Sequence, residues 1–262
     1  MKSRHLAGLI LSFCAVIAHS ETINFYAAAG VKVPAEKIIA AFERQTGHSV
    51  VRLYDTAGAA EEKFVAAGKQ GVLQGLLITT EVRINKSSKS STTETGALQA
   101  GKTMVVGDTL AGVAMSASFA QANPGLNIDT ADKLKFALLA AKRIAFSDPA
   151  RGATVGVHFV NVIEKLGIKD EVLAKSTKAK DGIETMKLVT AAEADLGITQ
   201  VSEIVQSQSK LLLGAFPKEL ELATRYSYWI ANTASDATKA LADAFQSEAA
   251  LESLTKNGLR VP

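Results

Sequence analysis

Apolar and polar residues follow one another along the first eighty residues in blocks that alternate between strand and helix. Short apolar runs at 23–29, 50–54 and 72–79 are typical of buried strands. Between the first two, Pro34 fits the first position of a helix that stops at Gly47. A second helix is expected after residue 60. This β-α-β-α-β order predicts a parallel sheet with helices on its faces.

The rest of the chain continues the alternation, with one polar interruption at 85–103, which predicts a surface loop running into a short helix. Further strands are expected at 109–115, 144–146, 195–199 and 226–230, and further helices at 128–139, 157–166, 183–189, 202–208, 237–245 and 249–254. The strands at 109–115 and 226–230 are predicted to cross between two halves of the molecule. The expected fold is therefore α/β with two lobes, 21–106 with 227–262 and 107–226, and a ligand cleft between them.

The first twenty residues have the features of a cleaved secretory signal. Lys2 and Arg4 precede an apolar stretch at 6–18, and Ala18-His19-Ser20 forms a small-x-small cleavage pattern. We therefore expect a periplasmic protein. Cys14, the only cysteine, would leave with the signal, so no disulfide or cysteine metal site is predicted.

Charge and histidine spacing narrow the classes of function. Without Lys2 and Arg4, 27 of the 29 basic residues remain against 26 acidic ones, which gives no reason to expect a nucleic-acid partner. His48 and His158 lack metal-ligand spacing, and no Gly-x-Ser-x-Gly motif is present. Neither a metal nor another cofactor is predicted.

Small and hydroxyl-bearing residues follow each of the first three predicted strands. These ends are Ala29-Gly30, Asp55-Thr56-Ala57 and Thr79-Thr80-Glu81. In parallel sheets, ligands bind beyond the carboxyl ends of the strands. The three ends are candidate ligand contacts, although tight turns favour the same residue types.

The loop at 147–156 joins a predicted strand to a helix start and is the strongest candidate for an anion site. It contains Pro149, Arg151, Gly152 and small residues up to Gly156. Such a loop exposes backbone N–H groups at the positive end of a helix, and Arg151 adds a planar cation. An ordinary strand-to-helix turn is the alternative interpretation.

Several segments spread over the chain resemble the periplasmic solute-binding proteins, and among them the molybdate-binding proteins of ABC importers. The resemblance lies in 25–29 (Phe-Tyr-Ala-Ala-Ala), 78–81, 147–149, 152–156, 165–167, 194–198, 216–217 and 257–259. It implies a type 2 binding-protein fold. The oxyanion site of that family implies ligand contacts at Gly30, at Thr56 and Ala57, at the backbone of 153–155 (Ala153, Thr154 and Val155), and at Gln200.

Gly30 and Gln200 replace hydroxyl donors of the family's site, which favours a larger carboxylate ligand over molybdate. Within the family the chain resembles the bacterial aconitate isomerases. That resemblance implies cofactor-free interconversion of cis- and trans-aconitate by allylic proton transfer. Glu81 is the first candidate for the base and His158 the second. Arg151, Gly152 and the neutral donors Thr56, Thr80 and Gln200 would hold the tricarboxylate.

Two other interpretations stay open. The protein could be a non-catalytic receptor that hands molybdate, another oxyanion or an organic carboxylate to the membrane subunits of an ABC importer. A third, weaker interpretation is an exported anion-binding factor without a transporter. Glu81 and His158 have structural alternatives as well, a helix-start carboxylate and a core or surface histidine. An isomerase requires an acid–base pair inside the closed cleft, whereas a receptor requires only closure on a ligand.

Overall fold

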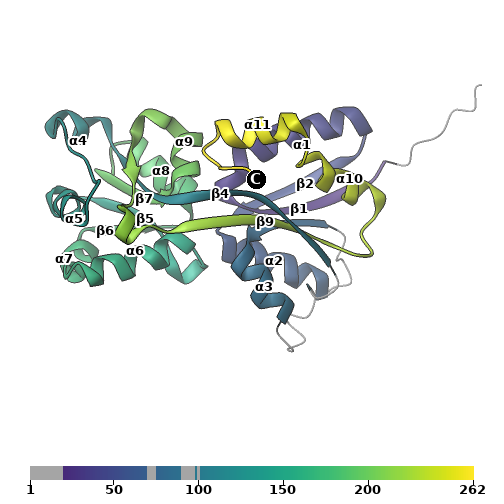
Figure 1. Cartoon of the computed structure of the whole chain (residues 1–262), viewed down its shortest axis with the longest axis horizontal. Helices are drawn as coiled ribbons and strands as arrows, with labels where there is room; N and C mark the ends of the chain where they lie inside the picture. Colours follow the sequence, from purple (N-terminus) through teal and green to yellow (C-terminus); the bar gives the residue numbers. More distant parts are fainter. Residues whose placement is uncertain (1–19, 70–74, 90–97, 99–100) are drawn as a thin grey trace, which may run out of the picture.

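The computed structural model describes residues 20–69, 75–89, 98 and 101–262, so most of the predicted signal segment lies outside the described residues. Two lobes lie side by side and are joined by two long strands, β4 (Gly101–Met115) and β9 (Ala223–Ala231) (Figure 1). The α/β fold and the two crossing strands that the pattern predicts are therefore present. The predicted lobe boundaries near residues 106 and 226 stay a prediction.

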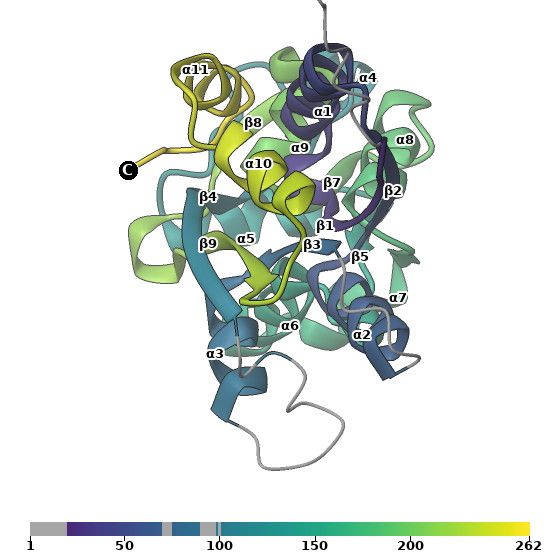
Figure 2. The same ribbon diagram turned by 90° about the vertical axis from the view of Figure 1, so that its right-hand side faces the viewer.

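The first lobe is built around three parallel strands. Its elements are β1 (Thr22–Ala28), a 3₁₀ turn η1 (Ala29–Val31), α1 (Lys32–Thr46), β2 (Ser49–Asp55), α2 (Ala57–Lys69), β3 (Gly75–Thr80) and α3 (Glu81–Lys89), and two C-terminal helices, α10 (Asp236–Ala244) and α11 (Glu248–Lys256). Helices α1, α10 and α11 lie on one side of the strands, and α2 and α3 lie on the other (Figure 2).

The second lobe contains the middle of the chain. Its helices are α4 (Ala117–Ala122), α5 (Ala131–Ala140), α6 (Thr154–Lys165), α7 (Lys169–Ala174), α8 (Gly182–Thr190) and α9 (Val201–Gln208), and its strands are β5 (Ile144–Ser147), β6 (Ser176–Ala179), β7 (Leu196–Gln200) and β8 (Leu212–Ala215). Short 3₁₀ turns lie at η3 (Pro149–Arg151), η4 (Ser209–Leu211) and η5 (Lys218–Leu220). The described helices are all too short or too polar to span a bilayer.

One nine-stranded sheet runs through both lobes in the order β2-β1-β3-β9-β4-β7-β5-β6, and β8 also pairs with β4. Strand β4 is antiparallel to β9 from Gly101 to Leu110 and antiparallel to β7 from Ala111 onward. A single strand therefore changes partner where one lobe meets the other. The strands β1, β2 and β3 are mutually parallel, as are β5, β6 and β7, so their carboxyl ends carry the loops that face the other lobe.

Each lobe has its own apolar core. In the first lobe Phe25 stacks on Phe245, with ring centroids 5.7 Å apart, and Phe64 packs edge-on against Trp229 at 5.6 Å. Residues from β9 and the C-terminal helices thus complete a core begun by β1 and α2. In the second lobe Phe146 and Phe159 pack at 5.1 Å.

Several predicted boundaries were wrong. Helix α1 begins at Lys32, directly after η1, and not at Pro34. Pro34 lies in the first turn of the helix, where the N–H that proline lacks would have no intrahelical acceptor. The predicted loop at 85–103 overlaps α3 at one end and β4 at the other, and 90–97 and 99–100 lie outside the described residues. Helix α5 begins at residue 131, where Thr130 caps it.

Candidate ligand site between the lobes

A small cavity of about 30 Å³ lies between the lobes, at the carboxyl ends of the parallel strands. The first lobe and β9 contribute Ala28, Ala29, Thr56, Ala57 and Tyr226; the second lobe contributes Ser147, Ala153, Thr154, Val155, Gly182, Thr199, Gln200 and Glu203. A volume of this size holds about two water molecules. Lysine and arginine do not occur among the described residues that line it.

Helix N-termini surround the cavity, because strands β2, β5, β6 and β7 each lead into a helix there. The helices α2, α6, α8 and α9 begin at Ala57, Thr154, Gly182 and Val201. The first N–H groups of a helix have no intrahelical acceptor, and the helix dipole makes that end positive. At α6 the N-cap is Ala153, whose side chain accepts no hydrogen bond, so the amides at 154–156 are available to a ligand.

The polar side chains of the cavity divide into those already paired and those free to bind. Thr56 donates to the carbonyl of Arg151, and Thr199 donates to the carboxyl of Glu203. Ser147 has only long contacts, 3.4 Å to Thr185 and to Thr199. Gln200 is 4% exposed; its Nε2 donates to Thr224 Oγ1 at 3.0 Å, and its Oε1 has no partner among the described residues. A buried unpaired oxygen on a residue that lines a cavity indicates that a ligand or water completes its hydrogen bonding.

Glu203 is the one acidic residue of the described cavity lining. Its Oε2 accepts from the Thr199 hydroxyl and, at 3.1 Å, from the backbone N–H of Gln200. Gly182 packs so closely that a Cβ there would overlap this carboxyl. Burial raises the pKa of Glu203 to about 7; its two hydrogen bonds oppose the rise, and the negative charge of Asp181 adds to it. The site therefore contains a group that titrates near neutral pH.

Tyr226 supplies a hydroxyl to the same cavity from β9. Burial, and after it the negative charge of Glu203, raises the pKa of Tyr226 well above its usual value, so the phenol stays protonated. Gly30 lies behind this ring: a Cβ at Gly30 would be 2.5 Å from Tyr226 Oη. The tyrosine thus fills the space beside Gly30, which is not among the described residues that line the cavity.

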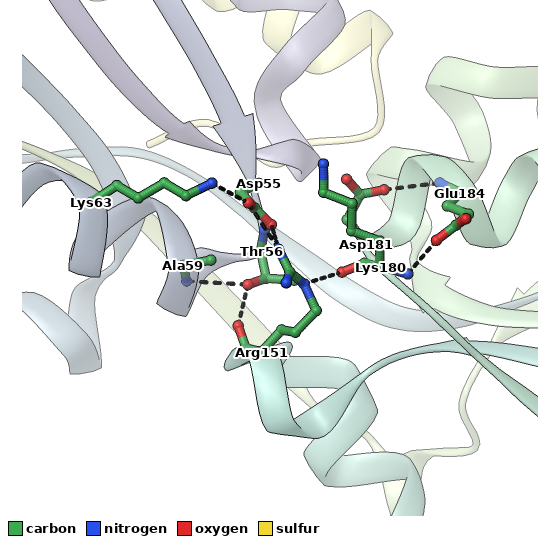
Figure 3. Close-up of polar contacts among 8 residues, drawn as sticks. All are labelled: Asp55, Thr56, Ala59, Lys63, Arg151, Lys180, Asp181 and Glu184. Atoms are coloured by element: carbon green, nitrogen blue, oxygen red, sulfur yellow. Dashed lines mark hydrogen bonds and ion pairs between the residues drawn. The ribbon is translucent and has the colours of Figure 1, made fainter.

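An ion pair between Arg151 and Asp55 links the two lobes beside the cavity (Figure 3). Its Nη2 lies 3.0 Å from both carboxyl oxygens of Asp55 at the end of β2, and its Nε donates to the Lys180 carbonyl at 3.1 Å. Lys63 of α2 donates to the same carboxyl at 2.8 Å. Burial raises the pKa of Asp55, but hydrogen bonds from Lys63, Thr56 N and Arg151 outweigh it, so the pKa is lowered. The Arg151 side chain is thereby committed to Asp55.

Two further contacts hold the lobes together. The N–H of Gly58 donates to the Gly152 carbonyl at 3.3 Å, and a Cβ on either glycine would lie 2.7 Å from the other's Cα. On the opposite side of the cavity Gln206 of α9 donates to the Gly30 carbonyl at 2.7 Å and accepts from Val33 N at 3.0 Å. The structure therefore has the closed arrangement of the two lobes.

The two predicted bases line a different space, an open groove of about 510 Å³. Its lining includes Thr80, Glu81, Gly152, Thr154 and His158. Glu81 lies 3.9 Å from Arg225, whose guanidinium also pairs with Asp108 at 2.8 Å, and His158 Nε2 lies 2.7 Å from the Leu220 carbonyl. Both side chains therefore already have protein partners, and Arg151 does not line this groove.

Of the predicted site residues, the structure brings six together around the cavity: Thr56, Ala57, Ala153, Thr154, Val155 and Gln200. Reasoning from the sequence missed Ser147, Thr199, Glu203 and Tyr226. The only sequence signal at Glu203 is its place three residues after Gln200, which is typical of a helix-capping glutamate. No group of three or more potential metal ligands occurs in the described part of the chain.

The sequence of this chain matches a known protein family. The sequence model for the family described as "bacterial extracellular solute-binding protein" matches residues 23–260. The chain belongs to this family. A search of curated proteins found no match for this solute-binding protein.

Solved structures share the fold of this solute-binding protein at low sequence identity. The periplasmic molybdate-binding protein of Azotobacter vinelandii has 18% identity and a TM-score of 0.67, with 92% of this chain and 99% of that chain covered. PEB3 with bound L-phospholactate has 16% identity and a TM-score of 0.62, over 92% and 100% of the two chains. Peb3 from Campylobacter jejuni has 14% identity, a TM-score of 0.59 and the same coverage.

Proposed function

We propose that this protein is the solute-binding component of an ABC importer, works outside the cytoplasm, and captures a small anionic ligand in the cavity between its lobes. The observation that carries the proposal is the cavity itself, closed between the lobes and surrounded by helix N-termini. The unpaired Gln200 Oε1 is an independent sign that a ligand belongs there.

The donor set favours an oxyanion or the head group of a small anion. Backbone amides at the start of α6, together with Ser147 and Tyr226, offer hydrogen-bond donors without a formal positive charge. Buried anions of this kind depend on complete hydrogen bonding. Two proteins with this fold, named above for molybdate and L-phospholactate, support the choice.

The test is a binding screen by isothermal titration calorimetry and thermal shift with molybdate, sulfate, phosphate, phospholactate and cis-aconitate. We expect at least one oxyanion or phosphate-bearing ligand to bind and to raise the melting temperature. Thr154→Pro removes the amide N–H at the first position of α6, where proline is tolerated because Ala153 before it is already extended, and should abolish that binding while leaving the fold intact. Absence of binding by every anion would overturn the proposal.

Isomerisation of aconitate is the second candidate, and Glu203 is the observation that favours it. A carboxyl group with a pKa of about 7 is suited to proton abstraction and return at neutral pH, and Tyr226 lines the same cavity. In this hypothesis Glu203 would replace Glu81 and His158 as the first choice of base. Proton NMR of cis-aconitate in D₂O tests it: conversion with deuterium at the allylic position supports an isomerase, and unchanged substrate refutes it.

A further inference from the structure

The cavity combines an anion-binding frame with hydrogen-bond acceptors, and this combination bears on the ligand. Gln200 Oε1 and the carboxyl of Glu203 both line it, and neither can donate while Glu203 is ionised. A fully deprotonated oxyanion placed here would set its oxygens against a carboxylate. A like-charged contact of this kind in a buried site is strongly unfavourable unless a proton lies between the two oxygens.

We propose that Glu203 couples ligand capture to one proton: the occupied site holds a single proton between the Glu203 carboxyl and a ligand oxygen. This inference rests on the proposed function and deepens it. A deprotonated dianion such as sulfate then binds only together with a proton from solvent, which leaves Glu203 as a carboxylic acid that donates. An oxyanion that keeps one acidic OH, such as monohydrogen phosphate, brings the proton itself and donates to the Glu203 carboxylate.

The hydrogen bonds to Glu203 distinguish its two oxygens and indicate which of them holds this proton. Thr199 Oγ1 and Gln200 N both donate to Oε2, and Gly182 closes the side toward α8. Because Oε2 already receives two hydrogen bonds, we assign the proton to Oε1 and to the remaining approach, the cavity that Glu203 lines.

The other titratable groups around Glu203 do not replace it. From the start of α8, Asp181 acts on it only through its negative charge, and its Oδ1 accepts from Glu184 N at 2.9 Å. From β9, Tyr226 stays protonated, because burial raises its pKa well above the usual value. Among the described residues, the side chains of β4, β5 and β7 that contact this end of α9 or line the cavity there include Thr109, Ser147 and Thr199, all of them neutral.

The sign of the pH dependence follows from this arrangement. A group with a pKa of about 7 is protonated in roughly nine molecules of ten at pH 6 and one of ten at pH 8. Binding of sulfate should therefore weaken about tenfold from pH 6 to pH 8 and should take up close to one proton at pH 8. At pH 8 phosphate should bind more tightly than sulfate, since the two anions have similar size and differ in the proton.

The experiment is calorimetric titration of the wild-type protein and of Glu203→Gln with sulfate and with inorganic phosphate, at pH 6 and pH 8, in buffers of different ionisation enthalpy. In Glu203→Gln the new amide can accept from Thr199 and Gln200 through its oxygen and donate to the ligand through its nitrogen. Sulfate affinity should then be equal at both pH values, without proton uptake, and the preference for phosphate at pH 8 should be lost.

A second variant guards against a folding defect in the first. Asp181→Asn keeps a side-chain cap for α8 but removes the charge that raises the pKa of Glu203, so the midpoint of the sulfate pH profile should move to lower pH. Sulfate binding of equal strength at pH 6 and pH 8 in the wild-type protein overturns the proton coupling alone. Absence of binding by both anions at both pH values also overturns the coupling, whereas the proposed function is overturned only when every anion of the wider screen fails to bind.

Discussion

The contact between Gly58 and Gly152 makes closure of the lobes sensitive to a single methyl group. In Gly58→Ala the added Cβ would lie 2.7 Å from Gly152 Cα and 3.1 Å from the Arg151 carbonyl, whereas ordinary contact begins at 3.4 Å. Both neighbours are backbone atoms of the other lobe, so relief requires that the lobes move apart. Overpacking of this kind costs about 1–3 kcal/mol. Ligand affinity should therefore fall about 5- to 150-fold.

The same substitution should leave the first lobe intact or stabilise it. Gly58 is the second residue of α2, and alanine there is favoured over glycine by about 0.5 kcal/mol. The melting temperature and the affinity are thus expected to change in opposite directions. Ala66→Gly, on an exposed position of α2, is the matched control: it should lower the melting temperature without an effect on closure.

Closure can be measured without a ligand as the distance between spin labels on the two lobes, by pulsed electron paramagnetic resonance. Exposed Glu62 on α2 and exposed Lys178 on β6 are suitable positions, in a protein whose Cys14 is replaced by serine. Gly58→Ala should lengthen the distance between the labels, and Ala66→Gly should not. An unchanged distance distribution in Gly58→Ala would refute the argument that backbone contact at this point limits closure.

Three further results are expected. Arg151→Ala should open the cleft in the same spin-label assay and weaken ligand binding about tenfold, because a charge-assisted hydrogen bond to buried Asp55 contributes about 1.5 kcal/mol. Lys63→Ala removes a hydrogen bond within one lobe and should leave closure unchanged. Because the pKa of Asp55 is lowered, closure should persist as pH falls through about 4 and be lost only in stronger acid, which scattering can follow. Asp195→Ala leaves two backbone N–H groups without an acceptor and should lower the free energy of unfolding, measured in urea, by about 2 kcal/mol. Arg143→Ala, at the exposed partner of Asp195, should lower it by less than about 1 kcal/mol.

Periodicity predicted the elements that bury an apolar face and missed those that do not. The buried runs that became β1, β3 and β7 were placed within a few residues. Strand β6 has the sequence Ser-Thr-Lys-Ala and lies at the edge of the sheet, so neither composition nor alternation marks it. The start of β4 was not predicted, because this part of the long crossing strand is exposed and contains polar residues. Its regular strand conformation depends on the pairing with β9 alone.

The candidate site was predictable where it is made of backbone and not where it is made of distant side-chain pairs. Loop chemistry indicated backbone amides in the loop at 147–156 and the turn at Thr56, and the family resemblance narrowed the amides to 153–155. The partner of Arg151 is Asp55, 96 residues away, and no local pattern connects the two. Glu203 has the sequence context of a helix cap, and its pKa departs from the usual value because the fold buries it against Gly182 and places the charge of Asp181 near it. Tertiary contacts, rather than residue type, decide the role of such groups.

The order of the strands along the chain differs from their order in the sheet, and this affects how the protein can fold during synthesis. Strand β3 pairs with β9, Leu76 opposite Ile230, so the central sheet of the first lobe stays incomplete until nearly the whole chain is present. The second lobe, by contrast, is drawn from one continuous stretch between the two crossings. A nascent or partly exported chain can therefore form the second lobe early, while β1 to β3 wait with an open sheet edge. Loss of the last forty residues would remove β9 as well as α10 and α11, all from the first lobe and its sheet, and leave the elements of the second lobe in the chain.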